Sequence, residues 1–203
     1  MAVFLWAGGT GNKGGGRYTK GMQRIRRELV FALVEGLWLQ VAAASPPAFQ
    51  EIGKKQGIPG DVLYALALTE SGRALKGRRQ IVPWPWTLNI AGKSHYYNSK
   101  KAACSALKQA VEDGKQVDAG FMQVNWYHNG RHMVKAPCDL LSPWKNITLG
   151  ARILARERRE NGGSLFRAIG TYHTGSENTP ERAKRAMRYR LRVAKHYSSL
   201  KKK

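Results

Sequence analysis

Acidic residues are scarce in this chain. Its 203 residues include 13 Asp and Glu against 35 Lys and Arg, which gives a formal net charge of +22 at pH 7. Such a basic surface favours polyanionic partners, namely nucleic acid, anionic lipid surfaces or acidic cell-wall polymers. Charge alone does not choose among these three classes.

Several signatures of catalysis and cofactor binding are also missing. The chain has no Gly-Xaa-Ser-Xaa-Gly nucleophile elbow, and its glycine runs within residues 8–16 do not lead into a helix start that would cradle a phosphate. The five histidines show no spacing typical of metal ligands. His128 and His132 are four residues apart, but Gly130 between them disfavours a helical ligand pair. We therefore expect neither a metal ion nor a cofactor.

Cysteine is rare, with Cys104 and Cys138 as the two in the chain. In an exported protein they can form one disulfide, and two buried free thiols are the alternative. A domain of ~150 residues buries enough surface to fold without a metal or a disulfide framework. The length fits one domain with extensions, and the 42% of hydrophobic residues is typical of a globular protein.

The apolar run near the N-terminus is shorter than the ~20 residues of a membrane span. Residues 1–21 are rich in glycine, and we expect them to be disordered or to precede a true start at Met22. Residues 22–44 combine a basic region, an apolar region and small residues, which predicts a secretory signal peptide. A membrane anchor or an amphipathic helix is the alternative. Residues 45–203 remain as the functional domain and keep most of the positive charge.

The stretch from Asp61 to Gly72 is almost entirely apolar and ends in a single carboxylate, Glu70. Pro59 and Gly60 mark its start, and its composition predicts a helix buried on most sides. Glu70 would lie in the last turn, where the helix dipole and apolar neighbours both raise a carboxyl pKa. A raised pKa suits a general acid. The alternative is a surface Glu at a solvated helix end.

The rest of the pattern predicts a mainly α domain. We expect helices over residues 48–56, 100–113, 146–160, 165–172 and from Thr179 onward, a hairpin over 87–97, an irregular segment over 77–86 and a compact apolar turn over 120–126. In the last helix, the residues expected to face inward are Ala183, Met187, Leu191 and Ala194.

Three segments carry the strongest functional signal: Glu70-Ser71-Gly72, then Gly120-Phe-Met-Gln-Val-Asn125, then Tyr172-His-Thr-Gly175. Their order, their spacing of about 50 residues and their helical surroundings resemble the catalytic domain of soluble lytic transglycosylases, which is related to goose-type lysozyme. The resemblance covers roughly residues 48–197. It implies a lysozyme-like helical domain with a small β-hairpin insertion.

The resemblance also implies roles for individual residues. Glu70 would protonate the glycosidic oxygen between MurNAc and GlcNAc and then act as base on the sugar's own 6-hydroxyl, leaving a 1,6-anhydro end. Gln123 and Asn125 would hydrogen-bond the N-acetyl sugar. Tyr172 would orient or tune Glu70. Peptidoglycan would then be the partner, and the periplasm the location.

Further positions complete the expected site. Ser71 would support the site backbone or contact a sugar, and Met122 would form part of the pocket wall. Two positions depart from the family pattern, because His173 stands where the family usually has Asn and Phe121 where it usually has Leu. The insertion around Trp84-Pro-Trp86 is similar to transglycosylases found with conjugative and secretion machineries.

Two other functions remain open at this point. A muramidase on the same fold would hydrolyse the same bond and needs a second carboxylate, for which Asp118 is the candidate, with a plain loop acid as the alternative. A non-catalytic module could use its basic surface, including Lys201-Lys-Lys203, to bind DNA or a secretion partner. No nucleic-acid recognition motif is present, so specific nucleic-acid binding is not expected. The oligomeric state is left open.

Overall fold

The computed structural model describes residues 45–202 except 76, 78 and 79, so the predicted signal peptide at 22–44 and the segment 1–21 lie outside the described residues. The longer helices are α2 (Pro47–Gln56), α3 (Gly60–Ser71), α4 (Lys100–Glu112), α6 (Pro143–Glu160), α7 (Leu165–Thr174) and α8 (Pro180–Lys201). Short helical turns are η2 (Trp126–Gly130), α5 (Arg131–Met133) and η3 (Pro137–Leu141). None of these helices is both long and apolar enough to cross a bilayer. The prediction of a mainly α domain is confirmed.

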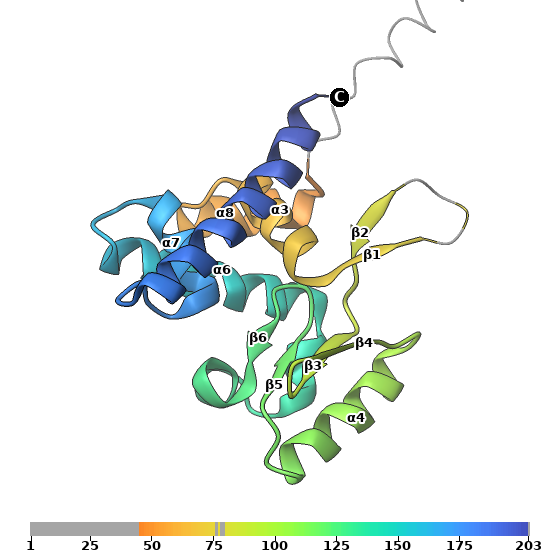
Figure 1. The fold of residues 1–203 in the computed structure, drawn as a ribbon. Coiled ribbons are helices and arrows are strands. Elements are labelled where there is room, and N and C mark those ends of the chain that lie inside the picture. Colours follow the sequence, from red (N-terminus) through yellow and green to blue (C-terminus); the bar gives the residue numbers. More distant parts are fainter. Residues whose placement is uncertain (1–44, 76, 78–79, 203) are drawn as a thin grey trace, which may run out of the picture. The chain divides into compact units, whose positions relative to one another are not determined.

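The strands form two small antiparallel sheets. One pairs β1 (Gly72–Ala74) with β2 (Ile81–Pro83), and the other has the order β4-β3-β5-β6, built from β3 (Thr87–Ile90), β4 (Lys93–Tyr96), β5 (Val117–Ala119) and β6 (Val124–Asn125). The predicted hairpin is confirmed as β3–β4. The prediction of an irregular segment over 77–86 is wrong in part, because a proline is tolerated at the end of a short edge strand. Figure 1 shows α3, α6, α7 and α8 on one side and the larger sheet with α4 on the other.

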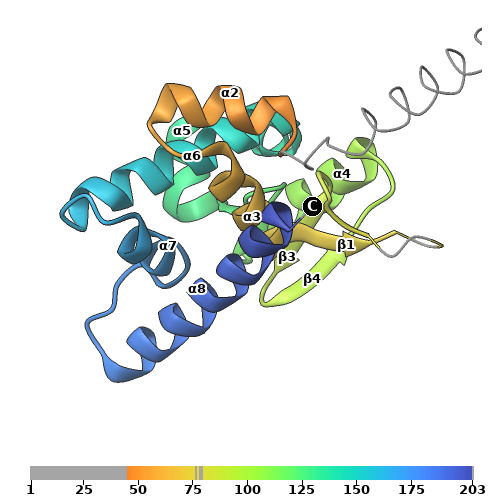
Figure 2. The same ribbon diagram turned by 90° about the horizontal axis from the view of Figure 1, so that it is seen from above.

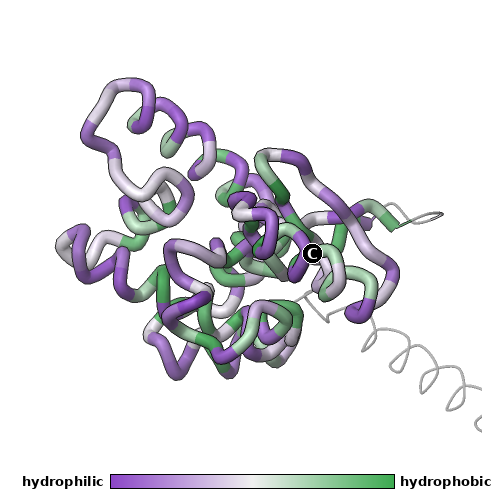
Figure 3. The backbone as a smooth tube through the Cα atoms, turned by 90° about the horizontal axis from the view of Figure 1, so that it is seen from below, coloured by the Kyte–Doolittle hydropathy of each residue, from purple (hydrophilic) through white to green (hydrophobic). Residues whose placement is uncertain are grey.

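Helix α3 is the central element of the described part. It packs against α2, α8 and β2 and lies between α2 and α8 in Figure 2. Leu63, Ala65 and Leu66 are completely buried, which agrees with a helix apolar on nearly all sides. The outer helices instead alternate hydrophilic and hydrophobic residues along their length (Figure 3), so each buries one face only. The segment that ends in Glu70 is therefore held from several directions.

Helix α8 begins as predicted, with Thr179 capping the Arg182 amide. The predicted inward face is wrong, because Met187 and Leu191 are 45% and 62% exposed. The residues that are buried instead are Ala186, Tyr189, Arg190 and Val193. Both sets have helical spacing, so periodicity alone could not decide between them.

The contacts of Arg190 explain why this face of α8 is the buried one. Its guanidinium pairs with Glu177 and donates to the backbone oxygen of Phe166 at 2.8 Å, so the buried charge is neutralised. Gly170 on α7 makes room for it, because a Cβ there would lie 2.3 Å from the guanidinium.

A disulfide joins Cys104 on α4 to Cys138 on η3. The alternative of two free thiols is therefore wrong. The bond closes a loop around β5 and β6, the strands that carry the second predicted site segment.

Candidate functional site

Glu70 lies in the last turn of α3, directly before β1. The hydroxyl of Tyr189, from the buried face of α8, donates a hydrogen bond to its Oε1. Burial raises the pKa of Glu70 from 4.5 to about 7; the Tyr189 hydrogen bond opposes this rise, the nearby Asp118 charge adds to it, and Arg192 opposes it. A carboxyl with a pKa near neutrality can both donate and accept a proton at physiological pH. This agrees with the pKa direction predicted from the helix end.

Ser71 joins α3 to the second segment. Its hydroxyl is completely buried and lies 2.8 Å from the Phe121 backbone oxygen and 3.0 Å from that of Ala67. A fully buried hydroxyl does not reach a sugar. Of its two expected roles, backbone support is the one that the geometry fits.

The second segment forms a tight turn between β5 and β6. Gly120 has a φ of +81°, and a Cβ there would lie 2.4 Å from the Asn146 side chain, so glycine is required. Asn146, from α6, accepts a hydrogen bond from the Met122 amide at 2.8 Å and donates one to the Ala119 oxygen at 2.8 Å. Asn146 is completely buried. The sequence motifs do not include Asn146, because it lies 24 residues after the Met122 amide that it binds.

Met122 and Gln123 face different surroundings in this turn. Met122 is completely buried, and its side chain fills the space that a Cβ at Gly150 would need. It therefore supports the turn from the core, and the expectation that it forms part of a pocket wall is wrong. Gln123 has a φ of +44°, and its amide nitrogen donates to the backbone oxygens of Gly120 at 2.9 Å and Thr87 at 3.1 Å. Its amide is thereby held in one orientation.

Asp118 is not a loop acid, because it lies on β5 opposite Asn125 of β6. The Asn125 amide donates to its carboxylate at 2.7 Å, and Asn125 also caps η2 by accepting from the His128 amide at 2.9 Å. Burial raises the pKa of Asp118, and its charge in turn raises that of Glu70. The two carboxyl groups therefore share one electrostatic environment.

Tyr172 and His173 lie in the last turn of α7, which extends through Thr174, beyond the predicted end at residue 172. The Tyr172 hydroxyl donates to the Met122 backbone oxygen at 2.7 Å. The hydrogen bond to the Glu70 carboxylate comes from Tyr189, not from Tyr172. His173 stacks on the Tyr189 ring, with centroids 4.3 Å apart and planes 3° from parallel.

Tyr189 is a second residue of the site that the three sequence motifs do not include. It is 1% exposed and lies 119 residues from the carboxylate that it contacts. The signal that could have found it is its helical spacing with Ala186 and Val193, which marks an alternative apolar face of α8. A tyrosine on a buried face usually has a partner for its hydroxyl.

Residues 97–193 match the family model of the transglycosylase SLT domain. The matched range contains Asp118, Gln123, Tyr172 and Tyr189 but begins after α3, so Glu70 lies outside it. No curated protein and no solved structure is significantly similar to this chain. Within the described residues, no three His, Cys, Asp or Glu side chains gather as metal ligands would.

The chain therefore carries a soluble lytic transglycosylase catalytic domain. Proteins of this family are lyases that act on the glycosidic bonds of peptidoglycan, so the chain is an enzyme with a cell-wall substrate. Such a substrate implies a location outside the cytoplasm.

Proposed function

We propose that Glu70 is the single acid and base of a lytic transglycosylase that cleaves the β-1,4 bond between MurNAc and GlcNAc. As an acid, Glu70 gives its proton to the bridging oxygen while the bond from that oxygen to C1 of MurNAc breaks. As a base, it takes the proton of the 6-hydroxyl while that oxygen bonds to C1, which closes a 1,6-anhydro ring. The observation that carries the proposal is the position of Glu70 in the last turn of the buried helix α3, hydrogen-bonded by Tyr189, where burial raises its pKa to about 7.

Tyr189 is proposed to help Glu70 release its proton in the first half of this cycle. Its hydrogen bond stabilises the carboxylate form of Glu70 and therefore opposes the rise in pKa that burial causes. Without the tyrosine, Glu70 would remain too weak an acid to give up its proton readily. The balance between burial and this one donor keeps both protonation states accessible.

The remaining predicted residues are proposed to place the sugar. Gln123 has its amide hydrogens committed to backbone oxygens, which leaves its carbonyl oxygen to accept from the N-acetyl N–H. Asn125 orients the Asp118 carboxylate through its hydrogen bond, and Tyr172 fixes the turn through the Met122 backbone oxygen. His173 covers the face of Tyr189.

A muramidase is the second candidate, and the position of Asp118 favours it. Its charge raises the pKa of Glu70, so a second carboxyl group lies in the same site. Hydrolysis by paired carboxylates needs such a group to activate water or to act as nucleophile. The Asn125 amide occupies one Asp118 oxygen at 2.7 Å, which leaves this carboxylate a poorer base.

Mass spectrometry of the soluble products from purified peptidoglycan distinguishes the two reactions. The proposal expects muropeptides with 1,6-anhydro ends from the wild type, none from Glu70→Gln, and retained anhydro products from Asp118→Asn. Reducing ends that disappear with Asp118→Asn would replace the proposal with the muramidase. Failure of the folded wild-type protein to release any muropeptide would contradict both enzymatic proposals and favour the basic binding module.

We also propose that residues 22–44 direct export to the periplasm and that the enzyme opens the wall locally for a conjugation or secretion apparatus. The second part rests on the insertion around Trp84-Pro-Trp86, which is similar to that of transglycosylases found with conjugative and secretion machineries. N-terminal sequencing of the exported protein tests the first part, with Ala44 or Ser45 as the expected boundary. Loss of conjugation or secretion in a deletion strain, restored by the gene, tests the second.

A further inference from the structure

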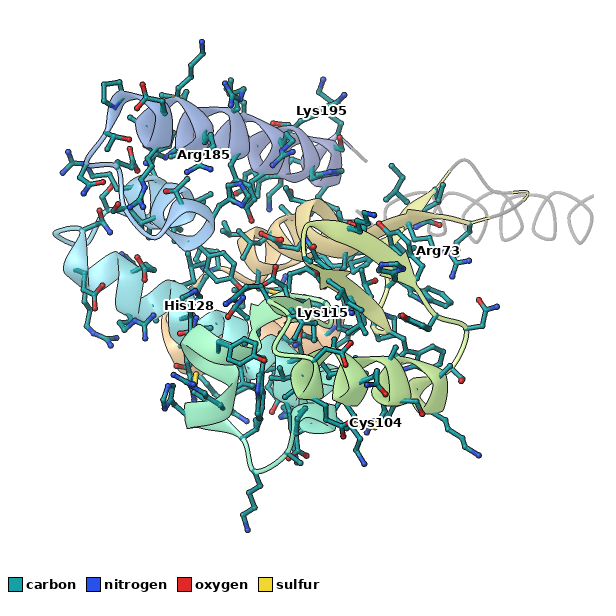
Figure 4. The ribbon with its side chains drawn as sticks, turned by 60° about the horizontal axis from the view of Figure 1, so that its bottom comes forward. Arg73, Cys104, Lys115, His128, Arg185 and Lys195 are labelled. Carbon is teal, nitrogen blue, oxygen red and sulfur yellow. A yellow bond between two sulfur atoms is a disulfide. The ribbon has the colours of Figure 1, made fainter. Side chains whose placement is uncertain are left out.

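A hollow of about 460 Å³ lies against α7 and α8 and is lined by His173, Arg185, Arg188, Leu191 and Arg192. Figure 4 labels Arg185 on α8. None of the three arginines forms a salt bridge with any residue that the structure describes. Glu177, in the loop between α7 and α8, is already paired with Arg190. The hollow therefore gathers positive charge that the described protein does not neutralise.

This hollow adjoins the catalytic carboxylate. Its His173 stacks on the Tyr189 ring, and the hydroxyl of that ring donates to Glu70. The guanidinium of Arg192 lies 5.5 Å from the centre of the same ring. One aromatic ring thus separates the cationic hollow from the acid that is proposed to cleave the glycan.

The chemistry of the hollow fits a carboxylate. Arginine guanidinium groups bind carboxylates through paired, charge-assisted hydrogen bonds, and several arginines around one hollow repel one another until an anion enters. Leu191, 62% exposed, adds an apolar contact beside them. When an amidase removes the peptide, MurNAc keeps one carboxylate, on the lactyl group attached directly to the sugar. The side-chain and terminal carboxylates of a stem peptide reach further from the sugar, which suits a hollow that lies beyond the Tyr189 ring from Glu70.

We propose that His173, Arg185, Arg188 and Arg192 form an anion subsite that holds a stem-peptide carboxylate next to the bond being cleaved. The inference rests on the proposed function and deepens it, because it makes peptide-bearing strands the preferred substrate over naked glycan. The subsite acts by positioning the strand over Glu70, so its benefit is lost when the peptide is absent.

The test compares cleavage rates on intact strands and on strands stripped of peptide by an amidase. The variant is Arg185→Gln with Arg188→Gln, because both side chains are exposed and neither is among the groups that shift the pKa of Glu70. We expect kcat/KM to fall about tenfold on intact strands and to stay unchanged on stripped strands, as expected for the loss of two partly exposed ion pairs.

The matched control is Arg152→Gln with Arg159→Gln, which also removes two positive charges, from exposed positions on α6. It is expected to leave both rates unchanged. An equal loss on intact and stripped strands would overturn the stem-peptide subsite, because the lactyl carboxylate of MurNAc, present in both, would then be the anion that the arginines hold. An equal loss in the control would leave only a general attraction between a basic protein and the wall.

Binding separates this inference from the proposed catalytic role. With Glu70→Gln as the host, calorimetry measures the Kd of a disaccharide-tetrapeptide and of the same disaccharide without peptide. We expect tighter binding of the peptide-bearing fragment, and an increase of about tenfold in its Kd when both arginines are replaced. Equal affinity for the two fragments would overturn the subsite even if Glu70 proves catalytic. A preference that depends on the arginines would support it even if cleavage follows another mechanism.

Discussion

Replacement of Glu70 by Gln should stabilise the protein, although it removes the proposed catalytic group. Burial raises the pKa of Glu70 from 4.5 to about 7 in the folded state, so folding opposes the charged form. Gln has a similar shape, can accept the Tyr189 hydrogen bond and carries no charge. The substitution therefore removes a cost that the native enzyme carries for its chemistry.

The size of the effect follows from the two pKa values. One pKa unit corresponds to about 1.4 kcal/mol, so the difference between 4.5 and about 7 amounts to up to about 3 kcal/mol. Below pH 4.5 the carboxyl is protonated in both states and costs nothing. Between pH 4.5 and 7 the folded state binds more protons than the unfolded state, so the wild type loses stability as the pH rises. Above pH 7 the full cost is present.

Urea unfolding at pH 4, 6 and 8 measures this difference. At pH 8, Glu70→Gln should be more stable than the wild type by up to about 3 kcal/mol, or roughly 6–12 °C in Tm, and the gain should vanish at pH 4. The control is Glu112→Gln, an exposed glutamate at the end of α4, for which no gain that depends on pH is expected. A gain equal at pH 4 and pH 8, or no gain at pH 8, would refute the reasoning.

Three further predictions concern the site and the disulfide-closed loop that contains its second segment. Tyr189→Phe removes the donor that lowers the pKa of Glu70, so the alkaline limb of the pH–rate profile should move up by about one to two pH units. Asn146→Ala leaves two buried backbone groups unpaired and should lower the free energy of unfolding by about 2–5 kcal/mol, measured by urea denaturation. Reduction of the disulfide of Cys104, which closes a loop with a sequence separation of 34 residues, should cost about 3–4 kcal/mol in the same measurement.

Each of these has a clear contrary result. Tyr172→Phe is the control for the first, because its hydroxyl donates to the Met122 backbone oxygen and its loss should leave the alkaline limb nearly in place. Equal displacement in both tyrosine variants would contradict the role of Tyr189. Unchanged urea midpoints in the asparagine variant, or after reduction, would show that the turn at Gly120 and the disulfide contribute little to stability.

Much of the architecture could be predicted because it depends on local interactions. Apolar spacing, prolines at helix starts and glycines after helix ends act within a few residues, and they located α2, α3, α4, α6, α7 and α8 closely. The hairpin β3–β4 follows from a tight turn at Ala91 and Gly92, both of which have positive φ. Glu70 could be singled out for the same reason, since one carboxylate ends an otherwise apolar run.

The pairing of distant segments could not be predicted in this way. Strand β5 was missed because Val117–Ala119 is three residues long and gains its stability from β3 and β6. Because β5 pairs with β6, Asp118 lies beside Asn125 in the site and not in a loop.

The sequence by itself determined where the helices run and that a buried helix ends in Glu70, because these features arise from neighbouring residues. Tertiary structure alone decided that Tyr189 rather than Tyr172 bonds that carboxylate, and that the inward face of α8 includes Arg190. Helical spacing permits either face of α8 to be buried. The choice depends on how α8 docks against α3 and α7, where Gly170 leaves room for the guanidinium. The contact between Tyr189 and Glu70 joins residues that are 119 positions apart in the sequence, so it forms only when the helices have packed.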